Sequence, residues 1–100
     1  MTSTVKLLAS FLRWTSKNKG FHQSHLSLYS AILIIYEENL SQSPFRVTRR
    51  ELMAHSAIRS YATYHRCIRK LQKDMFIDYT PSYHPRMAST IRLLLRKSIL

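Results

Sequence analysis

The feature that most constrains the fold is a pair of helix start signals in the middle of the chain. Thr48-Arg49-Arg50-Glu51 has the form of a capping box, in which the threonine hydroxyl accepts from a backbone amide and the glutamate accepts from the threonine amide. It predicts a helix of about two turns over residues 48–56. Ser60 is a second N-cap after a short connection, and a helix is predicted over 61–73 behind it. Two short helices joined by a tight turn indicate a helix-turn-helix over residues 48–75.

The second of these helices has one apolar face and one basic face, because residues three and four apart share a helix face. The apolar face holds Tyr61, Tyr64, Ile68 and Leu71. We expect this face, both tyrosines included, to lie in the core, with Cys67 as a small buried residue beside it. The opposite face and its edges hold Thr63, His65, Arg66, Arg69, Lys70 and Lys73.

The rest of the chain supplies two further helices and a β-hairpin. The period of the apolar residues predicts amphipathic helices over 4–17 and 24–39. We expect Ser24 to be the N-cap of the second helix, and its broad apolar stripe to be buried on more than one side. β-Branched and aromatic runs over 76–80 and 90–95 predict paired strands. We expect a single domain over residues 1–100 that is mainly α with a small β-hairpin (α+β), with a three-helix core plus an N-terminal helix. Its segments are the N-terminal helix (1–20), a helix (24–39), the helix-turn-helix (48–75) and the hairpin (76–95).

The positive charge of the chain is concentrated in the helix-turn-helix. Lys and Arg number 16 against 5 Asp and Glu, a formal net charge of +11. Residues 46–73 carry eight cations and one acid, a net +7, whereas residues 21–45 carry two acids and no Lys or Arg, a net −2. A local cluster of cations is the electrostatic pattern of a nucleic-acid-binding surface.

Several other classes of protein are disfavoured by the composition. The longest apolar run, near Ala31–Tyr36, is far shorter than the ~20 residues of a membrane span, and Met1–Ser10 do not resemble a signal peptide. Cys67 is the only cysteine, which fits a reducing compartment, so we expect a cytoplasmic protein. His22-x-x-His25 and the set His55, His65 and Cys67 lack the paired spacing of a zinc site, so we expect no metal and no cofactor. No small-molecule ligand is evident, and the few, scattered acids and the absence of a glycine-rich phosphate loop disfavour an enzyme.

The segment SYATYHRCIRKL (Ser60–Leu71), followed by Phe76-Ile77 and a hairpin, is similar to a known protein family. It resembles the recognition helix and wing of bacterial winged-helix transcription regulators. In their pattern Tyr64 occupies the place of a valine, Cys67 that of an alanine, and Ile68 and Leu71 those of leucines. The resemblance covers Thr48 to Leu95 and implies a winged helix-turn-helix fold.

The sequence departs from that family at Met75, where the pattern has a glycine that closes the recognition helix. A residue other than glycine in the left-handed conformation costs roughly 1 kcal/mol. Either Asp74 or Met75 therefore accepts this strain, or the helix ends in a different way.

The resemblance also implies roles for individual side chains on double-stranded DNA. The recognition helix would lie in the major groove, with Arg66 as the residue that reads base edges, because a guanidinium can bind guanine with two hydrogen bonds. Arg49 and Arg50 would contact the phosphate backbone, and Arg86 at the wing tip would reach phosphate or the minor groove. The complete expected DNA-binding set is Arg49, Arg50, Arg59, Ser60, Tyr61, Thr63, His65, Arg66, Arg69, Lys70 and Arg86.

Three functions remain open from the sequence. The leading one is sequence-specific binding of double-stranded DNA by a nucleoid-associated transcription regulator, or by an accessory factor of replication or of a mobile element. The second is a winged-helix protein-interaction module without direct DNA readout, whose surface would be Val5, Leu8 and Leu12. RNA binding is the third. A homodimer through the N-terminal helix is expected within the first, because DNA-binding domains of this size often pair to read two half-sites.

Overall fold

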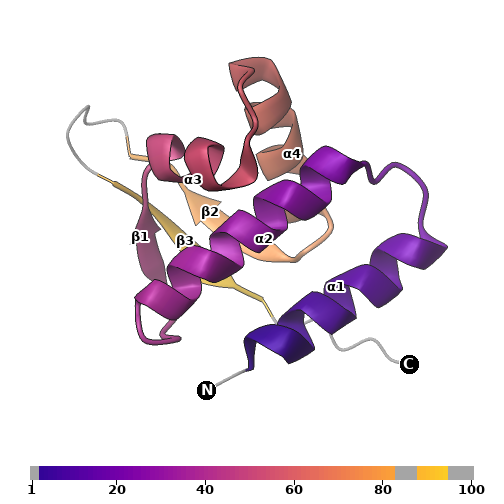
Figure 1. Cartoon of the computed structure of the whole chain (residues 1–100), viewed down its shortest axis with the longest axis horizontal. Helices are drawn as coiled ribbons and strands as arrows, with labels where there is room; N and C mark the ends of the chain where they lie inside the picture. Colours follow the sequence, from indigo (N-terminus) through magenta and orange to yellow (C-terminus); the bar gives the residue numbers. More distant parts are fainter. Residues whose placement is uncertain (1–2, 83–87, 95–100) are drawn as a thin grey trace.

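The computed structural model describes residues 3–82 and 88–94 of the chain. They form a compact α+β structure of four helices and one antiparallel sheet (Figure 1). No helix within these ranges is long and apolar enough to cross a membrane. The elements are α1 (Thr4–Lys17), α2 (Gln23–Glu38), β1 (Phe45–Val47), α3 (Arg49–Ser56), α4 (Tyr61–Lys73), β2 (Ile77–Thr80) and β3 (Ser89–Leu93).

Helix α2 is the centre of the structure and contacts α1, α3 and α4. Eight of its residues are buried, among them Leu28, Ala31 and Leu33, which lie on different sides of the helix. A broad apolar stripe is typical of a helix that packs on more than one side, so this expectation is confirmed. The expected N-cap was wrong, however. The helix begins one residue earlier than predicted, and the cap is His22 instead of Ser24.

Helix α1 packs on the core through a narrow strip, as the four-residue spacing of Leu7 and Phe11 allows. Both are buried, and the Phe11 ring stacks on the ring of Tyr29 in α2 with centroids 4.3 Å apart. The helix ends at Asn18, whose side-chain amide donates to the Trp14 carbonyl at 2.7 Å. Helix α1 is therefore held mainly by aromatic contacts, and much of its surface stays open to solvent.

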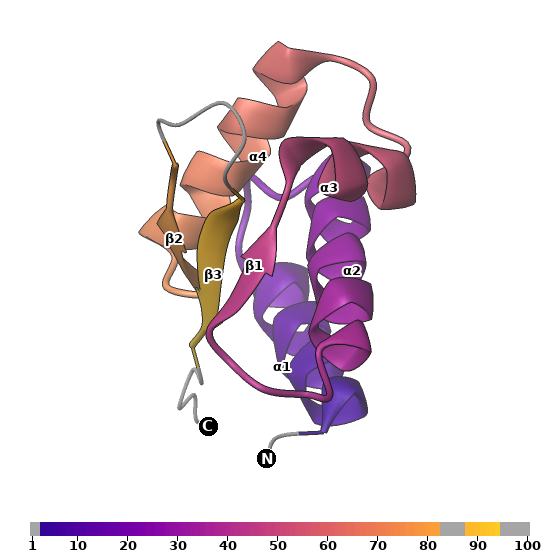
Figure 2. The ribbon, with the colours of Figure 1, turned by 90° about the vertical axis from the view of Figure 1, so that its left-hand side faces the viewer.

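The sheet has three strands, one more than the predicted hairpin. Strand β3 lies between β1 and β2 and is antiparallel to both (Figure 2). Phe45, Ile91 and Tyr79 are paired across the three strands and face the helices, whereas Arg46 on β1 is exposed on the outer face. No element was predicted for residues 45–47, because a strand of three residues gives too short an alternation to detect.

An aromatic cluster joins α1 to the junction between α4 and β2. The ring of Phe76, which is 2% exposed, lies 5.0 Å from Phe11, 5.8 Å from Tyr29 and 6.2 Å from Phe21 between centroids. Edge-to-face contacts at these distances are favourable because the positive ring edge meets the negative ring face. The cluster positions the C-terminal end of α4 against α1 and α2.

Candidate nucleic-acid interface

The N-terminal turns of α3 and α4 are fixed by side-chain caps, as predicted. The Thr48 hydroxyl accepts from the Glu51 amide at 3.0 Å, and the Glu51 carboxylate accepts from the Thr48 amide at 2.9 Å. The Ser60 hydroxyl accepts from the Thr63 amide at 3.3 Å. The capping box and the second N-cap are both confirmed, and they define where each helix begins.

The connection between the two helices is a tight turn around a left-handed residue. Ala57 has φ 60°, which ends α3, and the Ile58 amide then donates to the Ser56 hydroxyl at 3.3 Å. Ile58 is buried and anchors the turn to the core. This short, anchored turn holds α3 against α2 while α4 projects beyond them (Figure 1).

Helix α4 has the two faces that its sequence predicts, with one exception. Tyr64, Cys67, Ile68 and Leu71 are buried, and the Cys67 thiol donates to the Ser24 hydroxyl of α2 at 3.4 Å. Burial raises the pKa of the Tyr64 hydroxyl well above its usual range, so this side chain stays neutral. The prediction that Tyr61 lies in the core was wrong: its side chain is 60% exposed.

Tyr61 is exposed because it comes one turn before the buried face begins, and it lies beside α3 instead. The guanidinium carbon of Arg49 lies 4.3 Å from the centroid of the Tyr61 ring, a cation–π contact. The first turns of α3 and α4 are thus joined on the outside of the molecule by one arginine and one tyrosine.

The outward surface of α3 and α4 carries cations without carboxylate partners. Within residues 3–82 and 88–94, the one salt bridge joins Lys70 to Asp74, between the lysine Nζ and a carboxylate oxygen 3.0 Å apart. Because their charge is not neutralised inside the described part of the chain, the remaining cations are free to meet an external anion. The exposed ones are Arg49, Arg50, Arg59, Arg66, Arg69 and Lys73.

Lys70 is placed differently from these cations. Besides its pair with Asp74, its Nζ lies 4.9 Å from the centroid of the Phe21 ring, and its side chain is half-buried. Lys70 therefore ties the C-terminal half of α4 to the segment between α1 and α2. Lys70 was predicted to contact DNA, but in the structure its side chain makes contacts within the protein.

The other expected site residues fall into three groups. Ser60 serves as the cap of α4, Thr63 is partly exposed one turn later, and His65 is exposed on the same helix. Arg86 lies outside the described residues. Arg46 was not among the predicted DNA-binding residues. It lies on the exposed side of β1, and it extends the basic surface to the sheet. Phe45 and Val47 on either side of it are buried, but an alternation over three residues is too short to be detected in the sequence.

The end of β2 and the start of β3 are held together by side-chain hydrogen bonds. The Tyr79 hydroxyl donates to the Ser89 hydroxyl at 3.2 Å, and the Ser82 amide donates to the same oxygen at 3.2 Å. These contacts hold the end of β2 against the start of β3, at the end of the molecule to which the N-terminal turn of α4 also points (Figures 1 and 2). The paired strand ends and the first turn of α4 therefore lie toward the same end of the molecule.

Met75 accepts the strain where the sequence departs from the winged-helix pattern. Its φ is 67°, the left-handed conformation, whereas Asp74 has φ −89°. The Phe76 amide donates to the Leu71 carbonyl at 2.9 Å and the Met75 amide to the Gln72 carbonyl at 3.1 Å. These two bonds are a Schellman motif, the usual glycine-closed helix end.

We expect Met75→Gly to stabilise the protein by about 1 kcal/mol, because glycine removes the clash of a Cβ in the left-handed region. Met75 is 60% exposed, so its removal loses little apolar burial. Urea unfolding measures the change. Arg69→Gly, an exposed position inside α4, is the control and should destabilise by about 1 kcal/mol. A loss of stability in Met75→Gly would contradict the assigned backbone conformation.

A pair of histidines holds the start of α2 beneath α4. The His25 Nδ1 accepts from the His22 amide at 2.8 Å, and the two rings stack with centroids 5.6 Å apart. His25 is 3% exposed. Its pKa lies below 6.5, first because of burial and then because His22, Lys70 and Arg66 add positive charge nearby.

This lowered pKa predicts that stability decreases in mild acid. The unfolded chain takes up a proton on His25 near pH 6.5, whereas the folded state resists it, so the free energy of unfolding falls as the pH drops below about 6.5. The slope from one such proton reaches at most about 1.4 kcal/mol per pH unit. Urea unfolding from pH 7.5 to 5 measures it. His25→Gln keeps an acceptor without a titrating group, and an equal pH dependence in that variant would refute the assignment.

The described residues contain no group of three or more His, Cys, Asp or Glu side chains placed to hold a metal ion. What the interface offers is a set of unpaired cations, hydroxyls and one exposed aromatic ring on a rigid helix pair. Such groups bind anions and base edges. No family model, curated protein or solved structure matches this chain in the comparisons made with each.

Proposed function

We propose that this protein is a winged helix-turn-helix protein that binds double-stranded DNA in a sequence-specific manner. The observation that carries the proposal is the outward surface of α3 and α4, where six exposed cations lack carboxylate partners while the opposite face of α4 is buried. A helix of ~10–12 Å diameter matches the width of the major groove of B-DNA. In this arrangement α3 supports α4, and α4 enters the groove.

The order of the elements supports the same proposal. A short helix, a tight turn, a second helix and an antiparallel strand pair follow one another, and β1 completes the sheet on the other edge of β3. The β2–β3 connection would then be the wing, and Arg86 within it would reach the phosphate backbone or the minor groove. A transcription regulator, or an accessory factor of replication or of a mobile element, acting at the nucleoid in the cytoplasm, is the proposed context.

A fluorescence anisotropy titration of the protein with a mixed-sequence duplex of about 25 base pairs tests the first step. We expect binding at 50 mM salt and a logarithmic salt slope of about −4 to −5, since Arg66 is assigned to a base edge and each of the other five cations adds about −0.9 when it meets a phosphate. A duplex RNA of the same length should bind more weakly, because its deep, narrow major groove does not admit a helix. Absence of binding to DNA at 50 mM salt would end the proposal.

Selection of bound duplexes from a random DNA pool tests the sequence-specific part. Direct readout by α4 predicts that a motif of a few base pairs is enriched over successive rounds. If the pool stays random while binding persists, the protein binds the DNA backbone alone, and the claim of specific recognition is withdrawn.

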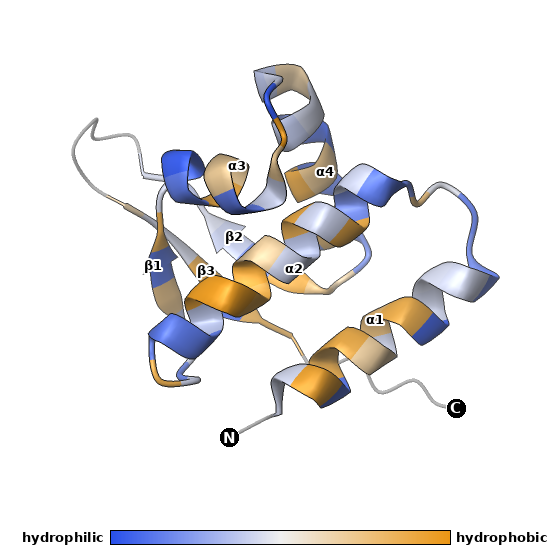
Figure 3. Ribbon diagram, in the orientation of Figure 1, coloured by the Kyte–Doolittle hydropathy of each residue, from blue (hydrophilic) through white to orange (hydrophobic). Residues whose placement is uncertain are grey.

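A second candidate function, protein interaction, is favoured by the open surface of α1 and α2. Val5 and Leu12 on α1 are 74% and 44% exposed, and Ile34 on α2 is 42% exposed. Leu8 was predicted to belong to this surface with Val5 and Leu12, but its side chain packs against the core. Figure 3 shows hydrophobic segments on both helices. Exposed apolar side chains that lie near one another are typical of an interaction surface.

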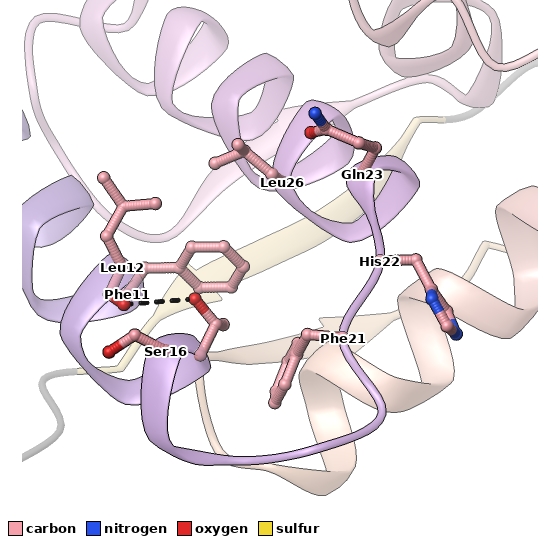
Figure 4. A pocket seen from close by; sticks show the side chains of 8 residues that line it. Phe11, Leu12, Ser16, Phe21, His22, Gln23 and Leu26 are labelled. Carbon is pink, nitrogen blue, oxygen red and sulfur yellow. Dashed lines mark hydrogen bonds between the residues drawn. The ribbon is translucent and has the colours of Figure 1, made fainter.

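A groove between the two helices adds to this surface. It has a volume of about 250 Å³ and is lined by residues of α1 and of the start of α2, including Phe11, Leu12 and Leu26, while the His22 side chain points away from them (Figure 4). We propose that a second copy of the chain uses this side, which gives a homodimer through α1. Sedimentation should show a dimer at micromolar concentration that Leu12→Glu dissociates, and a monomer at high micromolar concentration would exclude it.

A further inference from the structure

Arg49 and Tyr61 form a unit whose geometry suits one kind of ligand. The Arg49 guanidinium carbon lies 4.3 Å from the Tyr61 ring centroid, and both residues are exposed at the first turns of α3 and α4. The backbone that carries the ring is fixed, because α4 is capped by Ser60 and packed through Tyr64. The arginine therefore rests on a surface that belongs to the rigid part of the molecule.

Stacking leaves the hydrogen-bonding capacity of the arginine intact. When a guanidinium stacks on an aromatic ring, its flat face makes the contact and its N–H groups point outward in the plane of the group. An unsupported arginine loses side-chain entropy when a ligand immobilises it, and an arginine that already rests on a ring has lost part of that entropy before the ligand arrives.

The surroundings of Arg49 indicate an anionic ligand. The nearest acid in the sequence, Glu51, accepts hydrogen bonds from the amide and the hydroxyl of Thr48 through the same carboxylate oxygen, and it forms no salt bridge within the described part of the chain. Arg50 follows Arg49 and is also exposed. A pre-oriented guanidinium beside a second cation, with in-plane donors free, matches the oxygens of a phosphate group.

We propose that Tyr61 is a positioning residue that orients Arg49 for a backbone phosphate of the bound nucleic acid. The inference rests on the proposed function and adds a specific contact to it. Tyr61 acts through Arg49 in this arrangement and does not itself stack on a base. This positioning role also explains why a large aromatic residue occupies an exposed position at the start of α4.

A double-mutant cycle on duplex DNA tests the proposal. Tyr61→Leu should weaken binding about two- to fivefold, the value of an exposed cation–π contact, while the salt slope stays the same because Arg49 still meets the phosphate. Arg49→Ala should weaken binding and reduce the magnitude of the slope by about 0.9. The double variant should bind like Arg49→Ala alone, and Tyr61→Phe, which keeps a ring, should bind like the original protein.

Two results would overturn the proposal while DNA binding itself stands. One is unchanged affinity in Tyr61→Leu. The other is an equal loss from Tyr61→Leu in the presence and in the absence of Arg49, which would show that the tyrosine contacts the DNA directly. Equal melting temperatures of the variants confirm that a change in affinity does not come from unfolding.

A measurement on the free protein separates this inference from the proposed function. The ¹⁵N heteronuclear NOE of the Arg49 Nε–H group reports motion on the ps–ns timescale. We expect a high value in the original protein and a low value in Tyr61→Leu. A low value in both would refute the pre-orientation of Arg49 even if DNA binds. A high value that falls in Tyr61→Leu, together with no binding to duplex DNA, would support the pair and overturn its assignment to nucleic acid.

Discussion

Phe76→Ala is expected to destabilise the protein by about 3–5 kcal/mol, the usual cost when a buried aromatic ring is removed. Phe76 is 2% exposed, and its ring contacts those of Phe11, Tyr29, Phe21 and Trp14 at once. A single truncation therefore opens a cavity where α1, α2 and the α4–β2 junction meet. For a domain of about this size the loss is a large fraction of the total stability of roughly 5–15 kcal/mol.

Urea unfolding followed by circular dichroism measures this loss, and a midpoint lower by roughly 2 M is expected. Ile34→Ala is the control, because Ile34 is a large apolar residue that is 42% exposed and should change stability by less than about 0.5 kcal/mol. A loss below about 1 kcal/mol in Phe76→Ala would show that α1 does not pack on this cluster.

The elements that the sequence predicted best are those with local signals. Thr48 with Glu51, and Ser60 with the Thr63 amide, are contacts within one turn, so the chemistry of four residues determines where α3 and α4 begin. The buried face of α4 followed from the spacing of Tyr64, Ile68 and Leu71 in the same way. Local signals of this kind do not depend on the rest of the fold.

The features that the sequence did not predict depend on distant residues. Strand β1 exists because β3 offers an edge to Phe45–Val47, and β3 comes more than forty residues later in the chain. Tyr61 has the period of the buried face but is drawn outward beside Arg49 of the preceding helix. His22 replaces Ser24 as the cap of α2 because its partner, His25, is buried under α4.

The same distinction applies to the candidate interface. The concentration of positive charge over residues 46–73 could be predicted from the sequence. Which of these cations lack a carboxylate partner could not be predicted. Lys70 is engaged by Asp74 and Phe21, whereas Arg66 and Arg69 on the same helix have no carboxylate partner within residues 3–82 and 88–94. Only the packing of α4 against the α1–α2 segment makes this difference between neighbouring cations.

Arg66→Ala is expected to reduce affinity for a selected DNA site about 10- to 100-fold, which corresponds to ~1–3 kcal/mol for one bidentate contact to guanine. Arg66 is exposed on α4, one residue before the buried Cys67 and two before the buried Ile68, so it projects from the face opposite the core. A guanidinium there presents parallel N–H groups to the O6 and N7 of guanine in the major groove.

The informative quantity is the ratio of affinities for the selected site and a scrambled duplex, because a phosphate contact and a base contact change it differently. Loss of a base contact lowers this ratio, whereas loss of a phosphate contact weakens both duplexes equally. Arg13→Ala, the same change at an exposed position on α1, should leave the ratio intact, since α1 lies on the far side of the structure from the first turns of α4 (Figure 1). An unchanged ratio in Arg66→Ala would assign Arg66 to the phosphate backbone and leave base readout to Thr63, His65 or Arg69.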